Sequence, residues 1–270
     1  MKRKIIRIIK ITIIIYFVAG VILYLFQDKI LFHPVVLPQN YAYHFDTEFE
    51  EINVHADDKS SYNIIKFLPQ NGSAIKGAVL YFHGNRENIN HYAEFAPNFT
   101  RRGYEVWMCD YPGFGKSTGT LNEQALYDEA LQLYKMARAK GFSTDSIIIY
   151  GKSIGTGIAA QLAGIRDCKR LILESPYYSA TALAQHYFRM FPVRLLMHFK
   201  IPTYEFFPEI KAPITIFHGT DDGTIPYNQA EELKSLMKHG DELISIEGGH
   251  HNDLNDFPLM KRKLDSLLTQ

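Results

Sequence analysis

One stretch decides the fold of this chain: Ser146-Ile147-Ile148-Ile149-Tyr150-Gly151-Lys152-Ser153-Ile154-Gly155-Thr156-Gly157. Its β-branched run predicts a buried parallel strand, and the apolar residues 158–163 that follow predict a helix. Between them lies G-x-S-x-G, a pattern typical of a tight elbow that holds a serine hydroxyl clear of the backbone. The glycines on either side of Ser153 leave space for this turn. We therefore predict that Ser153 is a nucleophile, although the pattern by itself also fits a turn with an incidental serine.

The composition is that of one large α/β domain. The chain has 270 residues, of which 46% are hydrophobic, so it can bury a single large core. Its 29 basic residues balance its 29 acidic residues, and no basic stripe follows the first ten residues, so we expect no nucleic-acid partner. Cys109 lies in a predicted core strand, which favours a buried free thiol over a disulfide or a metal ligand.

The N-terminus has the pattern of a membrane anchor. Five basic residues within the first ten precede an uncharged apolar run, residues 11–26. Counted from Ile5, a helix here is about 33 Å long, enough to cross a bilayer. The small residues of a cleavage site are missing around Phe26, and a buried core helix would not carry five charges on one flank. We predict that residues 1–27 form a cytoplasmic basic flank and a transmembrane signal anchor. Residues 28–270 then form a domain on the extracytoplasmic side.

Strands and helices alternate through the domain, which predicts a mostly parallel sheet with right-handed crossovers. Apolar runs predict core strands at 78–82, 105–109, 147–150, 170–174, 214–217 and 243–246. Alternating residues at 45–55 and 61–68 predict an antiparallel hairpin at the sheet edge. Helices are expected over 89–102 and 121–140, the second opened by a capping box of Thr120 and Glu123. In such sheets the site lies beyond the carboxyl ends of the strands.

Two backbone N–H groups are predicted to stabilise an oxyanion at this edge. The N–H of Ile154 lies at the start of the helix that follows the elbow. The strand at 78–82 ends in His83-Gly84-Asn85, where we expect His83 to hold the loop by hydrogen bonds rather than to act as a base or metal ligand. The N–H of Asn85 would then be the second donor.

Carboxylates and histidines follow the last two predicted strands. Asp221 and Asp222 come after the strand at 214–217, and His250 and His251 come after the strand at 243–246. A serine nucleophile needs a histidine base and a carboxylate that holds the tautomer of the histidine. The residues alone therefore leave two candidates for the carboxylate and two for the histidine base.

Three motifs, in this order and with these gaps, resemble the α/β-hydrolase superfamily, and within it the membrane-anchored BEM46-like group. They are His83-Gly84-Asn85-x-x-Asn88, Asp110-Tyr111-Pro112-Gly113-Phe114-Gly115-x-Ser117 and Gly151-x-Ser153-x-Gly155. The resemblance runs from about Phe26 to the C-terminus and includes the single N-terminal anchor. Pro112 and Phe114 depart from the usual D-Y-R-G-Y-G.

The resemblance implies an α/β-hydrolase fold: a mostly parallel central sheet flanked by helices, with a small lid, plus one N-terminal transmembrane helix. It also implies a triad in the order Ser153, Asp222, His251. The pattern H-G-x-x-D-x-x-[IV]-P puts the acid at Asp222, and G-x-x-H-N-D puts the base at His251. His250 replaces a residue that is usually small, so His250 stays open as the base.

The alternation of strands and helices stops between residues 178 and 208, a segment rich in Phe, Met, Tyr and His. Its position matches the lid of α/β hydrolases. We expect this lid to wall an apolar acyl pocket and to contact the membrane.

Together these features predict a membrane-tethered serine hydrolase that cleaves carboxylic esters or thioesters through an acyl-enzyme intermediate, with no cofactor and no metal. The expected substrate is a small-molecule or lipid-like acyl compound, and the oligomeric state is not indicated. One alternative is a serine aminopeptidase-like enzyme, with an acidic residue such as Glu174 or Glu205 anchoring the amine of the substrate. The other is a membrane-tethered, non-catalytic binding domain.

Overall fold

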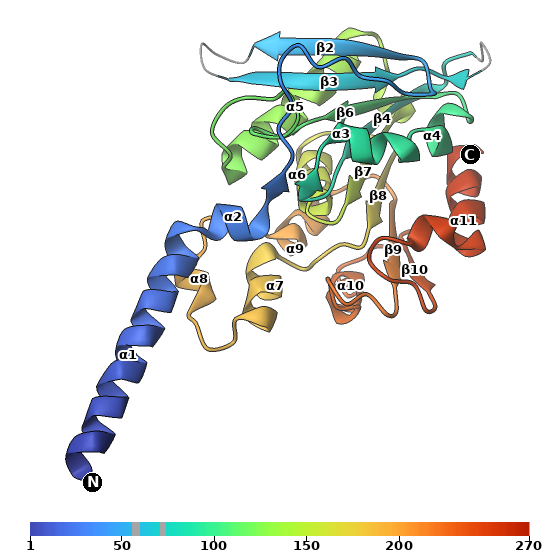
Figure 1. Cartoon of the computed structure of the whole chain (residues 1–270). Coiled ribbons are helices and arrows are strands. Elements are labelled where there is room, and N and C mark those ends of the chain that lie inside the picture. Colours follow the sequence, from blue (N-terminus) through green and yellow to red (C-terminus); the bar gives the residue numbers. More distant parts are fainter. Residues whose placement is uncertain (56–59, 71–73, 270) are drawn as a thin grey trace.

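The computed structural model describes residues 1–55, 60–70 and 74–269 (Figure 1). Its strands are β1 (His33–Pro34), β2 (Phe49–His55), β3 (Ser61–Phe67), β4 (Gly77–Phe82), β5 (Arg86–Glu87), β6 (Tyr104–Cys109), β7 (Ile147–Lys152), β8 (Arg170–Glu174), β9 (Ile214–Gly219) and β10 (Glu242–Ile246). Its α-helices are α1 (Lys2–Leu25), α2 (Gln27–Leu31), α3 (Ile89–Tyr92), α4 (Pro97–Thr100), α5 (Glu123–Ala139), α6 (Gly155–Ile165), α7 (Ala180–Tyr187), α8 (Val193–Leu196), α9 (Thr203–Phe206), α10 (Asn228–Lys234) and α11 (Pro258–Thr269).

Eight of the described strands form one sheet in the order β10-β9-β8-β7-β4-β6-β3-β2. The strands from β10 to β6 pair in parallel, whereas β3 is antiparallel to both β6 and β2. The predicted hairpin at the sheet edge is therefore confirmed, and its predicted turn lies outside the described residues. The mostly parallel α/β sheet is confirmed as well. A small parallel pair of β1 and β5 joins the segment after α2 to the loop after β4.

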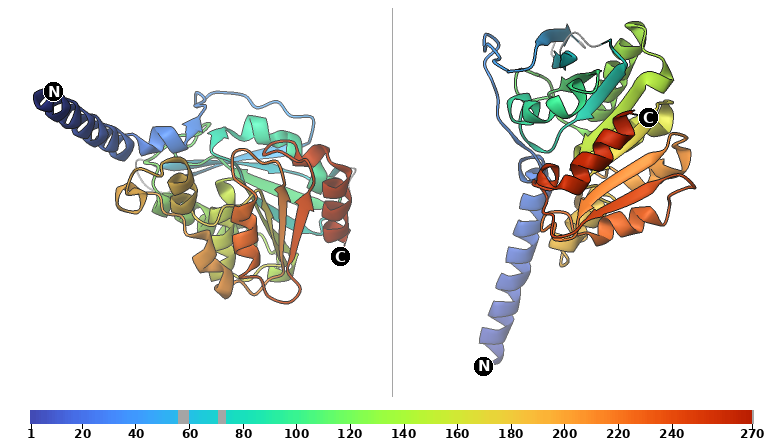
Figure 2. Two further views of the ribbon diagram at one scale, coloured as in Figure 1. Left: turned by 90° about the horizontal axis from the view of Figure 1, so that it is seen from below. Right: turned by 90° about the vertical axis from the view of Figure 1, so that its right-hand side faces the viewer.

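Helices cover both faces of the sheet (Figure 2). On one face, α5, α6 and α10 bury residues such as Leu133 and Leu162 against Leu80 and Ile149. On the other, α3, α4 and α11 bury residues such as Phe99 and Leu264 against the opposite side chains of the same strands. Because side chains alternate along a strand, a strand covered on both faces needs apolar residues on both sides, which is why β4 and residues 147–150 of β7 are continuous apolar runs.

Two predicted helices differ in detail. The helix expected over 89–102 is broken into α3, a 3₁₀ turn and α4, because Pro97 has no N–H with which to continue the hydrogen-bond ladder. Helix α5 begins at Glu123 and not at Leu121. Its cap is Asn122, whose side chain accepts the N–H of Ala125 at 2.9 Å, so the predicted capping box is wrong.

The first helix extends away from the domain, and the segment 178–208 lies beside its C-terminal half (Figure 1). That segment contains α7, α8 and α9, and we call it the lid. None of the side chains of α1 is buried. Among the described residues, α1 is the helix that is long and apolar enough to cross a membrane. Cys109 and Cys168 are both buried free thiols, as predicted for Cys109.

Candidate active site

The elbow lies between β7 and α6, and its two glycines are required by sterics. Ser153 has a φ of 53°, in the left-handed region that non-glycine residues rarely adopt. A Cβ at Gly151 would lie 2.5 Å from the carbonyl oxygen of Gly155, and a Cβ at Gly155 would lie 2.2 Å from the carbonyl oxygen of Phe82. The G-x-S-x-G pattern therefore reflects close backbone approach on both sides of the strained serine.

Ser153, His251 and Asp222 are hydrogen-bonded in series. Nε2 of His251 lies 3.0 Å from Oγ of Ser153, and its Nδ1 lies 2.8 Å from Oδ2 of Asp222. Asp222 is acceptor-only when ionised, so Nδ1 carries the proton and Nε2 is left as the acceptor for the serine hydroxyl. This tautomer is the one that a general base for Ser153 needs.

Asp222 is held as a carboxylate by its surroundings. Its Oδ1 accepts the N–H groups of Thr224 and Ile225, both at 2.8 Å. Burial by itself would raise the pKa of Asp222, but the hydrogen bond and charge of His251 and these two N–H groups outweigh it and lower that pKa. Behind it, Nε2 of His218 bonds the carbonyl of Ile225 at 2.8 Å, and burial lowers the pKa of His218. His218 is therefore neutral and holds residues 222–225, the loop that carries Asp222, through its hydrogen bond to Ile225.

The neighbouring candidates, His250 and Asp221, lie away from Ser153. His250 is exposed, and both its N–H and its Nδ1 bond Asp253, at 2.7 and 3.0 Å. Asp221 is exposed too, with its carboxylate 3.3 Å from the hydroxyl of Thr220. The structure brings His251 and Asp222 to Ser153 and leaves His250 and Asp221 at the surface.

The two predicted oxyanion donors lie at the start of α6 and in the loop after β4. Within the described residues, neither the N–H of Ile154 nor that of Asn85 donates to another protein group. The carbonyl of Asn85 accepts the N–H of His33 at 2.8 Å, and its side-chain amide donates to the carbonyl of Leu31. The loop of Asn85 is thus fastened to the segment between α2 and β1.

His83 has the structural surroundings that the sequence suggested. It is fully buried, lies against the ring of Tyr111 and is bonded through Nδ1 to the carbonyl of Gly84 at 2.7 Å. Its Nε2 lies 3.4 Å from Asp110, which also accepts the N–H of Ile89 at 2.9 Å. These contacts join the loop of Asn85 to the turn after β6.

Comparison with known proteins agrees with this architecture. Residues 73–206 match the sequence profile of the family described as serine aminopeptidase, S33. Alpha/beta hydrolase domain-containing protein 17C of Xenopus tropicalis is 28% identical over 195 residues, covering 71% of this chain and 61% of the relative. The chain thus spans less than two thirds of the length of the curated relatives that it matches first. An esterase of Pyrococcus furiosus has a TM-score of 0.66 at 18% identity, over 88% of this chain and 97% of its own. The chain belongs to the α/β-hydrolase superfamily.

A second solved structure of the superfamily also superposes. A soluble variant of monoglyceride lipase from Saccharomyces cerevisiae has a TM-score of 0.60 at 17% identity, covering 85% of this chain and 99% of its own. At these identities, the solved structures establish the fold of this α/β hydrolase. Membership of the membrane-anchored BEM46-like group stays a prediction.

Sequence patterns did not predict a buried ion pair that lies next to Ser153. Lys152 and Glu174 face each other across the β7–β8 pairing, and Nζ of Lys152 bonds the Glu174 carboxylate. The hydroxyl of Tyr150 also donates to Glu174, and the amide of Asn255 lies 3.2 Å from it. The signal was present, because each charge ends an apolar strand and needs a partner when buried. Glu174 is fully buried and occupied, so it is not available to anchor the amine of a peptide, as the aminopeptidase alternative suggested.

The other acidic candidate, Glu205, accepts the hydroxyl of Tyr204 at 2.8 Å and lines a groove on the far side of α7. That groove carries charges of both signs, including Glu123 and Arg194, so it is not a dedicated amine site. Among the described residues, no cluster of three or more His, Cys, Asp or Glu side chains is placed to hold a metal ion.

Proposed function

We propose that this protein is a membrane-tethered serine hydrolase that cleaves carboxylic esters or thioesters. The observation that carries the proposal is the series of hydrogen bonds from Ser153 through His251 to Asp222, at 3.0 and 2.8 Å. Each residue follows a different parallel strand, and all three meet at the carboxyl edge of the sheet, where ligands bind in open α/β folds.

In the first half-reaction, Oγ of Ser153 attacks the acyl carbonyl carbon while Nε2 of His251 takes the hydroxyl proton. The N–H groups of Asn85 and Ile154 stabilise the negative charge on the former carbonyl oxygen. The carbon–oxygen or carbon–sulfur bond to the leaving group then breaks, and His251 returns the proton to the leaving alcohol or thiol.

In the second half-reaction, His251 takes a proton from water, and the hydroxide attacks the acyl-serine. Collapse of the intermediate releases the carboxylic acid and returns the proton to Ser153. Asp222 keeps Nδ1 protonated and stabilises the imidazolium that forms in each step. Its lowered pKa means that it stays ionised through the cycle.

The membrane tether rests on α1. Its basic N-terminal end favours the cytoplasmic side, which places the hydrolase domain on the extracytoplasmic side. The helix has 24 residues and is therefore about 36 Å long, enough to cross the hydrocarbon core.

Three observations favour ester or thioester hydrolysis over the alternatives. The similar structures include an esterase and a monoglyceride lipase. The family profile is named for an aminopeptidase, but Glu174, which lies opposite Lys152 on the neighbouring strand, already pairs with that lysine. A purely binding role would not require the bond between Ser153 and His251.

The test is labelling of native membranes by a fluorophosphonate, which reacts with activated serines. Wild type should be labelled, Ser153→Ala should not, and His251→Ala should be labelled far more slowly. His250→Ala is the matched control, since its ring bonds Asp253, and should be labelled like wild type. A folded wild type that is not labelled contradicts the enzyme and leaves the binding domain. Equal labelling of wild type and His251→Ala contradicts the role of His251.

A further inference from the structure

The lid is bonded directly to the first helix. The hydroxyl of Tyr16 donates to the carbonyl of Met190 at 2.7 Å, and its ring stacks on Phe191 with 4.8 Å between centroids. Farther along, the buried amide of Gln27 donates to the carbonyl of Leu196 at 3.0 Å and accepts the N–H of His198 at 2.6 Å. These contacts hold the lid against α1 and α2 at both ends.

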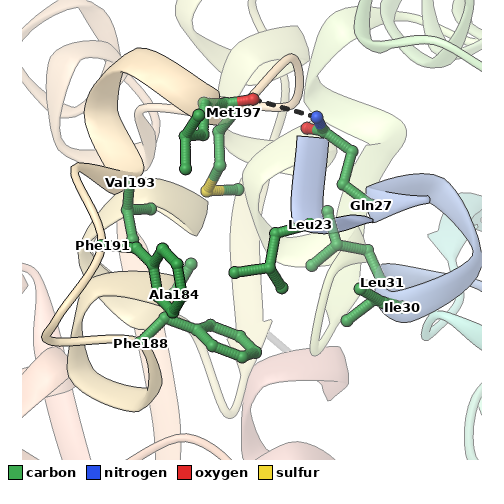
Figure 3. Close-up of a pocket in the computed structure, with 10 residues that line it drawn as sticks. Leu23, Gln27, Ile30, Leu31, Ala184, Phe188, Phe191, Val193 and Met197 are labelled. Atoms are coloured by element: carbon green, nitrogen blue, oxygen red, sulfur yellow. Dashed lines mark hydrogen bonds between the residues drawn. The ribbon is translucent and has the colours of Figure 1, made fainter. Parts of the chain in front are cut away.

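An apolar pocket lies between the lid and the first two helices, α1 and α2. Its walls come from α1 and α2 on one side, with Leu23, Ile30 and Leu31, and from the lid on the other, with Ala184, Phe188 and Met197 (Figure 3). Apart from Gln27, whose amide is already bonded, every wall residue is apolar. A second hollow, bordered by Gly20 and Val21, continues along α1 and shares Phe191 and Leu196 with the first. The two form one groove, which we call the anchor groove. Their cavity volumes are about 40 and 240 Å³, so the groove is narrow beside α2 and wider along α1.

The inner end of the anchor groove lies next to the candidate active site. Its wall residue Leu31 accepts a hydrogen bond from the side chain of Asn85, the predicted oxyanion residue. On the lid side, Tyr187 precedes the wall residue Phe188 and donates to the carbonyl of Thr224, at 2.8 Å, in the loop that bonds Asp222. The inner end of the groove is therefore linked on one side to the loop of Asn85 and on the other to residues 222–225, the loop that carries Asp222.

The outer end of the groove must lie within the bilayer if α1 crosses it. The lid first contacts α1 at Tyr16, so the part of α1 free of the lid is about 21 Å long, shorter than a hydrocarbon core of roughly 30 Å. The lid tip, residues 189–195, exposes large apolar side chains there: Met190 is 80% and Leu195 82% exposed. The long side chains of Arg189 and Arg194 can extend to the headgroups.

We propose that the anchor groove binds the long acyl chain of a membrane-resident substrate, admitting it from the bilayer through a lid tip immersed among the lipids and presenting its carbonyl to Ser153. This inference rests on the proposed hydrolase function. Burial of methylenes in an apolar groove is favourable, but a chain drawn from lipid gains little over its hydrocarbon surroundings. The groove therefore acts chiefly by positioning the carbonyl carbon of the substrate at Ser153. It selects substrates by the length of their acyl chain, because it excludes chains that are too long for it.

The first test narrows the groove and leaves the chemistry alone. Ala184→Phe fills the anchor groove from α7, and Ala182→Phe makes the same change on the same helix but in the polar groove on its far side. The full-length protein in lipid nanodiscs is assayed on 4-nitrophenyl acetate and 4-nitrophenyl palmitate. For Ala184→Phe, kcat/KM for palmitate should fall at least about tenfold, because a chain kept out of the groove no longer holds its carbonyl carbon in place at Ser153. Acetate hydrolysis should stay within about twofold, as should both activities of Ala182→Phe.

The outcomes distinguish a failure of the groove proposal from a failure of the proposed hydrolase function. If Ala184→Phe leaves palmitate hydrolysis unchanged, or lowers acetate hydrolysis as much, the groove does not bind the chain although the hydrolase stands. If wild type hydrolyses neither ester and Ser153 is not labelled by a fluorophosphonate, the proposed function itself fails. Monopalmitoylglycerol and an S-palmitoylated peptide distinguish a lipid from an acylated protein as the source of the chain. Whichever is hydrolysed must show the same loss in Ala184→Phe.

The second test reports immersion of the lid tip without using activity. A polarity-sensitive fluorophore is attached to Leu195→Cys, with Ile165→Cys as the control at the far end of α6. The native Cys109 and Cys168 are buried. On reconstitution into vesicles, emission from position 195 should shift to the blue and be quenched by brominated lipids, and emission from position 165 should not change. Equal behaviour of the two sites overturns immersion of the lid.

Discussion

The buried ion pair of Lys152 and Glu174, next to Ser153, should give unequal losses of stability when one partner or the other is removed. The side chains of Lys152 and Glu174 are 4% and 0% exposed, so neither charge can recover its hydration in place. Removing one partner of such a pair typically destabilises a protein by about 3–5 kcal/mol, because the other charge stays buried and uncompensated.

The two single variants differ in what they leave behind. In Lys152→Met, Glu174 keeps the hydroxyl of Tyr150 and the amide of Asn255 as donors, so we expect a loss of about 3 kcal/mol, near the lower limit. In Glu174→Met, the ammonium of Lys152 keeps, among the described residues, only a cation–π contact with Phe95, 5.5 Å from the ring centroid. There we expect a loss of about 4–5 kcal/mol.

The assay is urea unfolding of the full-length protein in mild detergent, analysed as a double-mutant cycle. The double variant should lose at least about 2 kcal/mol less than the sum of the single losses, since the residues are in contact. Single losses below about 1 kcal/mol, of the size of a surface pair, would refute the reasoning. Additive losses, or a greater loss in Lys152→Met, would refute the unequal roles of the remaining donors.

Three further predictions concern the elbow and the acid. Gly155→Ala brings a Cβ to 2.2 Å from the carbonyl oxygen of Phe82 and should destabilise the domain by about 3 kcal/mol or more. Gly223→Ala is the control: a Cβ there meets nothing within 4 Å, so the melting temperature should stay nearly unchanged. Asp222→Asn should lower kcat by about 10⁴-fold in an ester assay, because the amide no longer selects the tautomer of His251 that has a free Nε2; a loss below about tenfold would place the acid elsewhere. The pKa of Asp222 is lower in the folded chain than in the unfolded chain, so its contribution to stability is present above the unfolded pKa, about 3.9, and is lost as the pH falls through the folded value. Unfolding midpoints of wild type and Asp222→Asn should therefore converge as the pH drops below about 4, and a gap that widens on acidification would reverse the inferred sign.

Local sequence patterns predicted the elements well where sterics act within a few residues. The β-branched run before Gly151 predicted β7, and the spacing of Gly151, Ser153 and Gly155 predicted the turn into α6. The ends of helices were less well predicted where two nearby residues could each cap the helix. Thr120 and Asn122 are both good caps, and the structure uses Asn122 because Glu123 instead accepts the N–H groups of Lys200 and Ile201 from the lid.

The choice between neighbouring site candidates depended on loop conformation. His250 and His251 are equivalent as residue types, but Asp253 holds His250 outward through two hydrogen bonds. The pairing of Lys152 with Glu174 depended on the register between two strands that are far apart in the chain.

The sequence by itself determined the α/β class, the parallel core strands, the elbow at Ser153 and the apolar N-terminal helix. All of these arise from sterics and hydrophobic periodicity over short spans, which act whatever the rest of the chain does. Only the tertiary structure decided that His251 and Asp222 meet Ser153, that Lys152 and Glu174 neutralise each other, and that the lid docks on α1. Those contacts join residues tens to more than a hundred positions apart, and their geometry is set by strand register and by the packing of complementary surfaces, neither of which a local pattern encodes.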